Sequence, residues 1–118
     1  MSDIDVWEAL SEYFLDNEPD LEYIADVCAK SNFSIRELEH KLHYEVAPVC
    51  FYNLLSIAGV WTGFKQEWLN KEINENLSKP FTLSKITDAL IYRLLLKRSI
   101  QSNWMITVEL IIQKREIA

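Results

Sequence analysis

The chain has 118 residues, which is the size of one domain rather than two. Hydrophobic residues make up 49% of it and aromatic residues 12%, so the chain can bury a core and intrinsic disorder is excluded. Two glycines and three prolines are too few for a turn-rich β-sandwich or barrel. Twelve basic and eighteen acidic residues leave a net charge of −6, which argues against a nucleic-acid-binding module because such modules are usually basic.

The start of the chain is acidic and lacks the basic and apolar regions of a secretory signal. The most apolar run, residues 89–96, is interrupted by Arg93 and falls short of the ~20 residues of a membrane span. We therefore expect a cytoplasmic protein that does not bind a membrane. In that reducing compartment Cys28 and Cys50 are expected to be free, buried thiols rather than a disulfide.

Hydrophobic spacing predicts three helices in the first part of the chain. Apolar residues recur every three or four positions between Ile4 and Phe14, which indicates a first amphipathic helix. Pro19 suits the first position of a second helix. Ser34 and Glu37 fit a capping box, in which each side chain accepts from the backbone amide of the other residue, and they predict the start of a third helix.

The most apolar part of the chain follows a proline. Pro48 must interrupt or restart the third helix, because its ring removes a hydrogen-bond donor and restricts the residue before it. The stretch from Val49 to Ala58 is almost wholly apolar, so we expect it to form the central buried helix of the fold. Gly59 is placed to end that helix in a left-handed C-cap.

Two further helices are expected in the second half. A fifth is centred near Trp68 and stops before Pro80, and a sixth is capped by Thr82 or Ser84. We expect the sixth helix to carry one apolar face and to end in cations that suit the helix dipole. The apolar face comprises Ile86, Leu90 and Leu94, with Ile91 and Leu95 beside them, and the terminal cations are Lys97 and Arg98.

The C-terminal segment from Trp104 to Ile112 alternates apolar and polar residues as a strand does. We favour a helix, because no other segment alternates in this way and a lone strand would have no partner; an extended segment is the alternative. The chain is thus predicted to be all-α, with residues 1–118 forming one compact domain of five to seven helices.

Residues that could hold a metal or act as a nucleophile are few. His40 and His43 are three apart on a predicted helix, and Cys28 and Cys50 could complete a ligand set, but neither cysteine has a close partner of the kind that zinc motifs require. We interpret the histidines as two surface residues. A thiol on an apolar helix face stays protonated, and the two glycines match no phosphate-binding motif. We therefore expect no catalytic residue, no metal and no cofactor.

Charge is distributed unevenly along the chain. Residues 1–29 contain nine acids and no base, whereas the remainder contains nine acids and twelve bases, a net of +3. A one-signed field of this kind speeds encounter with a basic partner; solvation alone is the alternative. The acids that we expect to contact a partner are Glu12, Asp16, Glu18, Asp20, Glu22 and Asp26.

A loop after the apolar run carries large aromatic side chains. Trp61 and Phe64 are predicted to pack with Trp68 against the end of the central helix, since Phe64 and Trp68 lie one helical turn apart. The alternative is an exposed aromatic anchor, because protein interfaces favour such residues. Trp61 and Phe64 are therefore included among the candidate partner-binding residues.

Several short segments share a pattern with a known group of proteins. They are Glu45-Val46-Ala47-Pro48-Val49, Asn53-Leu54, Ala58-Gly59, Trp61, Gly63-Phe64 and Trp68-Leu69, preceded by Val6–Ser11 and Phe14–Asp16. Over residues 4–75 this pattern resembles a family of small uncharacterised bacterial proteins. The resemblance implies a bacterial origin and a small helical domain, and it carries no established activity.

The function that these features favour is binding without catalysis. We expect a bacterial immunity protein or antitoxin that neutralises a basic toxin through its acidic face. The alternative is an adaptor or structural subunit of another bacterial assembly, including a homodimer built on exposed aromatic residues. A helical enzyme with an unrecognised site is a third class. Nucleic acid and membranes are not expected partners.

Overall fold

The computed structural model describes residues 3–15, 17–55, 64–80 and 82–117, apart from the side chain of residue 84. Within these ranges every regular element is a helix and no strand occurs, which confirms the all-α prediction. The radius of gyration is 13.9 Å, close to the ~13 Å of a folded 100-residue domain. None of the helices in the described part of the chain has the length and apolarity needed to cross a membrane.

The first two helices form one layer of the fold. Helix α1 (Asp3–Ser11) continues into a 3₁₀ turn, η1 (Glu12–Phe14), and α2 (Leu21–Lys30) packs against α1. The prediction that Pro19 opens the second helix is wrong. Asp20 is the N-cap, and its side chain accepts from the backbone amide of Tyr23 at 3.1 Å. A carboxylate at this position satisfies an amide that the start of the helix leaves unpaired, which a proline side chain cannot do.

A second group of helices forms a single rod that contains a wider turn. Helix α3 (Ile35–His40) starts at the predicted capping box, with Ser34 and Glu37 each accepting from the other's amide at 3.1 Å. The π-helical segment η2 (Lys41–Val46) follows, and α4 (Ala47–Cys50) carries Pro48 in its first turn. Pro48 restarts the helix as predicted, since the preceding π turn absorbs the register change around a residue that lacks an amide.

The apolar stretch after Pro48 does not form the expected central helix over its described residues. It consists of α4, a turn at Phe51, and the short α5 (Tyr52–Leu55). Phe51 is fully buried, but Tyr52 and Leu55 are 53% and 43% exposed. Gly59 lies outside the described residues. The centre of the core is instead the buried face of α1, which packs against α2, η2 and α6.

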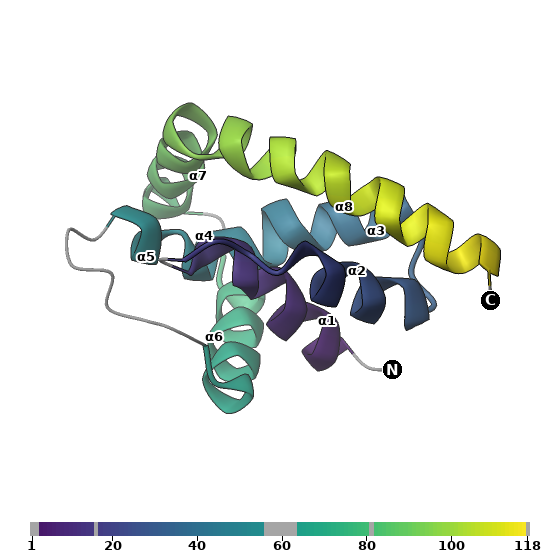
Figure 1. Ribbon diagram of the computed structural model, residues 1–118. Helices are drawn as coiled ribbons and strands as arrows, with labels where there is room; N and C mark the ends of the chain where they lie inside the picture. The colour runs from purple at the N-terminus through teal and green to yellow at the C-terminus, as the bar shows by residue number, and fades with distance from the viewer. Residues whose placement is uncertain (1–2, 16, 56–63, 81, 118) are drawn as a thin grey trace.

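Three longer helices complete the fold: α6 (Gln66–Ser78), α7 (Leu83–Leu95) and α8 (Lys97–Ile117). Figure 1 shows α6 and α7 at the end of the molecule away from the two termini, while α8 runs back along α2. Thr82 caps α7 as predicted. The C-terminal segment is helical, also as predicted, and its Trp104 and Ile111 are fully buried.

The apolar face of α7 is exposed, and one prediction for this helix is wrong. Leu90 is 51% and Leu94 79% accessible, because no described element covers the side of the helix that spacing identifies as apolar. Lys97 and Arg98 do not end this helix. The chain turns at Leu96, and the two cations open α8.

A few polar side chains join distant segments of the core. Arg115 in the last turn of α8 donates to the carbonyl groups of Cys28 (3.0 Å), Ser31 (3.2 Å) and Phe33 (2.6 Å). A guanidinium group at the C-terminus of α2 suits the helix dipole there. It thereby ties α8 to α2.

Candidate functional site

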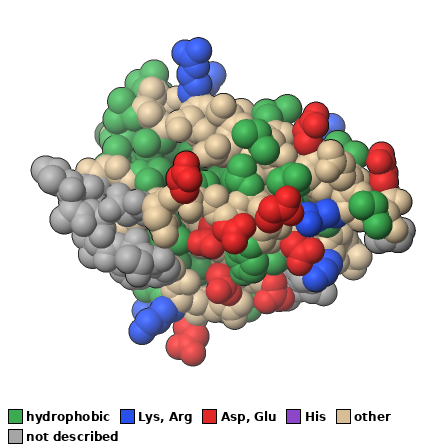
Figure 2. Space-filling view, in the orientation of Figure 1, with side chains coloured by type: hydrophobic (Ala, Val, Ile, Leu, Met, Phe, Trp, Pro, Cys, Tyr) green, Lys and Arg blue, Asp and Glu red, His purple; other side chains and the backbone are tan. Residues whose placement is uncertain are grey.

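The acids of α1 and α2 gather on one face of the molecule. Glu8 and Glu12 lie one helical turn apart, and Asp20 at the start of α2 lies close enough to repel Glu12. Burial raises the pKa of Glu12 above its usual range, and repulsion from Asp20 and Glu8 raises it further. We call Glu8, Glu12 and Asp20 the acidic cluster; Figure 2 shows acidic side chains spread over this face.

Tyr23 lies beside the acidic cluster, and the negative charge of the cluster affects the pKa of its hydroxyl. Its ring is 41% exposed. Partial burial raises the pKa of its hydroxyl, and the negative charges of Glu8, Glu12 and Asp5 raise it further. An exposed tyrosine among carboxylates offers a partner both ring surface and a hydroxyl donor.

Other acids of the first two helices are neutralised within the molecule. Glu22 lies 3.1 Å from Lys114, Asp26 lies 3.0 Å from Lys30, and Asp3 lies 2.5 Å from Lys41. In the described part of the chain no lysine or arginine lies within ion-pair distance of the three acids of the acidic cluster. Their charge is therefore the part of this face that a partner could still pair.

The structure brings together two of the six acids expected to bind a partner. Glu12 and Asp20 belong to the acidic cluster, whereas Glu22 and Asp26 have partners of their own. Glu18 is exposed, and Asp16 lies outside the described residues. Glu8 is not among the six acids predicted to contact a partner, although its spacing of one helical turn from Glu12 is a signal that could have included it.

Phe64 and Trp68 make the ring contact that their spacing predicts, but the central helix that they were expected to seal does not form over the described residues. The rings of Phe64 and Trp68 are stacked, with centroids 5.7 Å apart and an interplanar angle of 18°. Phe64 is only 8% exposed, so its ring belongs to the core and offers a partner little surface. Trp61 lies outside the described residues.

The two histidines do not share an environment. His40 is exposed and stacks on Tyr44 at 5.0 Å, but His43 is only 7% exposed, which corrects the expectation of two surface histidines. A π turn holds more residues than an α turn, so the two rings diverge. The described residues contain no group of three or more His, Cys, Asp or Glu side chains that could hold a metal ion.

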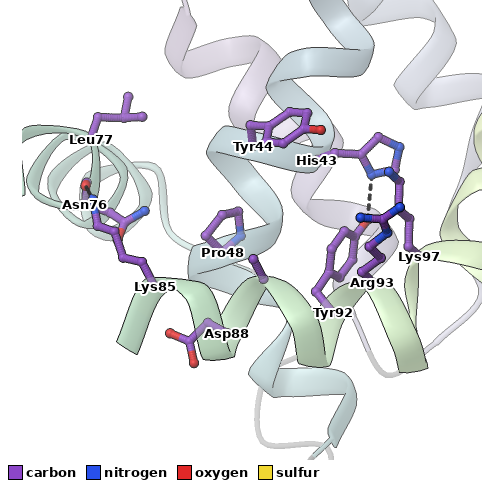
Figure 3. A pocket seen from close by; sticks show the side chains of 11 residues that line it. His43, Tyr44, Pro48, Asn76, Leu77, Lys85, Asp88, Tyr92, Arg93 and Lys97 are labelled. Atoms are coloured by element: carbon purple, nitrogen blue, oxygen red, sulfur yellow. Dashed lines mark hydrogen bonds between the residues drawn. The ribbon is translucent and has the colours of Figure 1, made fainter. Parts of the chain in front are cut away.

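His43 belongs to a chain of side-chain hydrogen bonds that no local sequence signal indicates. Gln101 donates through its amide nitrogen to Glu39 at 2.9 Å, so its oxygen accepts from Nε2 of His43 at 2.6 Å. Nδ1 of His43 then accepts from the hydroxyl of Tyr92 at 2.7 Å, which Figure 3 shows. Burial lowers the pKa of His43 and raises that of Tyr92, so both groups are uncharged near neutral pH.

Both thiols are free and buried, as predicted. Burial raises the pKa of Cys28 to about 12 and that of Cys50 also well above its usual range. A nucleophilic cysteine requires a lowered pKa. These two thiols are therefore unsuited to catalysis.

The fold and the sites described above define a small all-helical domain with an acidic face. The chain belongs to a family of uncharacterised domains: the model described as Domain of unknown function (DUF7079) matches residues 1–110. This confirms the resemblance to an uncharacterised family, and the match continues beyond residue 75 into α8. Comparison with curated proteins and comparison with solved structures give no match.

Proposed function

We propose that this domain is a binding protein without catalytic activity that presents the acidic cluster to a cationic surface of a protein partner. The observation that carries the proposal is that Glu8, Glu12 and Asp20 share one face and no described lysine or arginine pairs with them. Like charges held together reduce stability. A cluster of this kind is typical of a site that is kept for function.

The most specific form of the proposal is an immunity protein or antitoxin of a bacterial toxin that acts on nucleic acid. Such a toxin needs a basic cleft to hold phosphate groups. Carboxylates placed where phosphates would lie match that charge without offering a bond to cleave. The acidic cluster supplies the carboxylates, and Tyr23 beside it supplies ring surface of the kind that dominates protein interfaces.

The exposed aliphatic face of α7 favours a second candidate function, an adaptor or structural subunit of a larger assembly. Leu83 and Leu94 are each 79% exposed, and Leu95 is 65% exposed. Several large aliphatic side chains exposed on one helix are unusual for a monomer and are typical of protein contacts. This surface lies on a different helix from the acidic cluster, so substitutions can separate the two functions.

The proposal can be tested by co-expressing the domain with the product of the neighbouring gene. We expect the two proteins to copurify and the domain to suppress any toxicity of its partner. A triple variant, Glu8→Gln, Glu12→Gln and Asp20→Asn, should lose both effects, because asparagine still caps α2 while the charge is removed. Its matched control removes three exposed acids elsewhere: Glu75→Gln, Glu109→Gln and Glu116→Gln.

The control variant carries the same net charge as the triple variant and should behave as the wild type. If both variants bind equally well, the acidic cluster is not the interface. If binding is lost instead when Leu90 and Leu94 are changed to serine, the adaptor function on α7 is favoured.

A further inference from the structure

Outside the acidic face the molecule has a concave pocket of about 430 Å³. Its walls come from η2 and α4, from the end of α6, from α7 and from the first residue of α8. Figure 3 shows Leu77 and Lys85 at one end, and His43, Arg93 and Lys97 at the other. A volume of this size is in the range of small-molecule sites.

The charged side chains at the two ends of the pocket differ in whether other residues of the fold bind them. At the first end, Nζ of Lys85 donates to the carbonyl groups of Asn76 (2.6 Å) and Lys79 (2.8 Å), so it holds the end of α6. Asp88 accepts from the hydroxyl of Tyr52. Burial raises the pKa of Tyr52, and the hydrogen bond to Asp88 and its charge raise it further, to about 12. The polar groups of this end are thus occupied by the fold.

At the other end the cations have no partner among the described residues. No described carboxylate lies within ion-pair distance of Arg93 or Lys97. Beside them lies the buried Tyr92 with its bond to His43 (Figure 3). We call Arg93 and Lys97 the cationic end of the pocket.

The charges in the first turn of α8, beside the cationic end, are opposite to those that a helix N-terminus favours. Lys97 and Arg98 occupy the first turn of α8, which contains no acid. The N-terminus of a helix favours negative charge, so cations there reduce stability. Two cations at a helix start, next to a third on α7, form an electropositive spot that the fold itself leaves unneutralised. Departures of this kind are expected at functional sites.

We propose that this pocket binds a small organic anion, a carboxylate or a phosphate monoester. Its charged group contacts Arg93 and Lys97, a pair in which arginine supplies a planar fork of donors and lysine a point charge. Its apolar body lies along Pro48, Leu77 and Ala89, which line the rest of the pocket. The site is independent of the acidic cluster, because the two are formed by different helices.

The test is a titration of the ¹⁵N-labelled domain followed by NMR, with phenyl phosphate, benzoate and the neutral benzyl alcohol as probes. We expect one or both anions to shift the amide resonances of residues 89–98 in a saturable way, and benzyl alcohol to bind at least about tenfold more weakly. Saturation by phenyl phosphate alone assigns the site to phosphate monoesters, and saturation by benzoate alone assigns it to carboxylates. Absence of saturable shifts with both anions would overturn the proposal.

Substitutions identify the groups that hold the anion. Arg93→Gln and Lys97→Gln should each weaken binding about tenfold, as expected for a lost charged hydrogen bond. The matched controls, Arg36→Gln and Lys71→Gln made separately, each remove the same charge at an exposed position, on α3 and on α6, and should bind as the wild type does. Equal weakening in the controls would show that the anions respond to net charge, and it would contradict a site at the cationic end.

Discussion

The acidic cluster and the pocket that holds the cationic end are built in different ways. The acidic cluster is formed by neighbours in the sequence, from α1, η1 and the start of α2. Arg93 and Lys97 are also close in the sequence, but the pocket wall beside them depends on the buried His43, which contacts Tyr92 and Gln101, 49 and 58 residues away along the sequence. A charged face can thus be read from composition, whereas a charged pocket depends on which helices meet.

The sharpest way to break this comparison is to remove one hydroxyl from each region. Tyr92→Phe should lower the free energy of unfolding by about 1–2 kcal/mol, because Nδ1 of the buried His43 would lose its donor. Tyr23→Phe, in the exposed acidic region, should change it by less than about 0.5 kcal/mol. Urea denaturation measures both, and equal effects would contradict the contrast between a buried scaffold and an exposed face.

The contributions of the buried His43 and of Glu12 in the acidic cluster to folding stability should change with pH in opposite directions. Burial lowers the pKa of His43, and Lys97 lowers it further, while Gln101 and Glu39 act in the other direction. The unfolded chain therefore takes up a proton at the ordinary pKa of about 6.5, where folded His43 does not. Stability should fall as the pH decreases from about 7 through that value, by at most about 1.4 kcal/mol per unit.

His43→Asn should flatten this dependence, because it removes the buried group whose pKa is lowered. Denaturation curves recorded between neutral pH and about pH 5 give the slope. A slope that survives in the His43 variant would assign the pH response to another group.

The first turn of α8 permits a test of the cationic end in the folded domain. Lys97→Glu should raise the free energy of unfolding by about 0.3–1 kcal/mol, because it places an acid at a helix N-terminus. Lys114→Glu, in the last turn of the same helix, should lower it, since it opposes the dipole and faces Glu22. Thermal melts of the two variants would contradict this account if the signs were the same.

The smallest expected effect concerns the acidic cluster. The raised pKa of Glu12 means that its charged form is disfavoured in the folded state. Glu12→Gln should therefore raise stability at neutral pH by a small amount, within about 0.5 kcal/mol because the group is only partly buried. The difference should vanish as the pH falls below the ordinary pKa of glutamate, where the wild-type side chain is protonated in both states.

Local signals predicted local structure well. The capping box at Ser34, the N-cap at Thr82 and the helical C-terminal segment were predictable because each depends on residues within one or two turns. Pro19 was misassigned because Asp20 beside it makes the better cap. These successes show that helix starts and helix formation depend on nearby residues. They do not show which other helices a segment packs against.

Tertiary contacts were not predictable in the same way. Spacing identifies an apolar face on α7 but not whether another element covers it, so the exposure of Leu90 and Leu94 was missed. His43, Tyr92 and Arg115 act through partners far away in the sequence, and nothing near them indicates those partners. For the acidic face, the sequence predicted the charge, but only the fold separates Glu22 and Asp26, which are paired internally, from the acidic cluster.

The measurement that tests the central claim most directly is the association rate of the domain with its copurified partner as a function of ionic strength. We predict a rate that falls steeply as salt shortens the Debye length to ~8 Å, and a severalfold slower rate in the Glu8→Gln, Glu12→Gln, Asp20→Asn variant at low salt. The variant with Glu75, Glu109 and Glu116 replaced by glutamine should keep most of the wild-type rate. An association rate that depends neither on salt nor on the acidic cluster would contradict the proposed function.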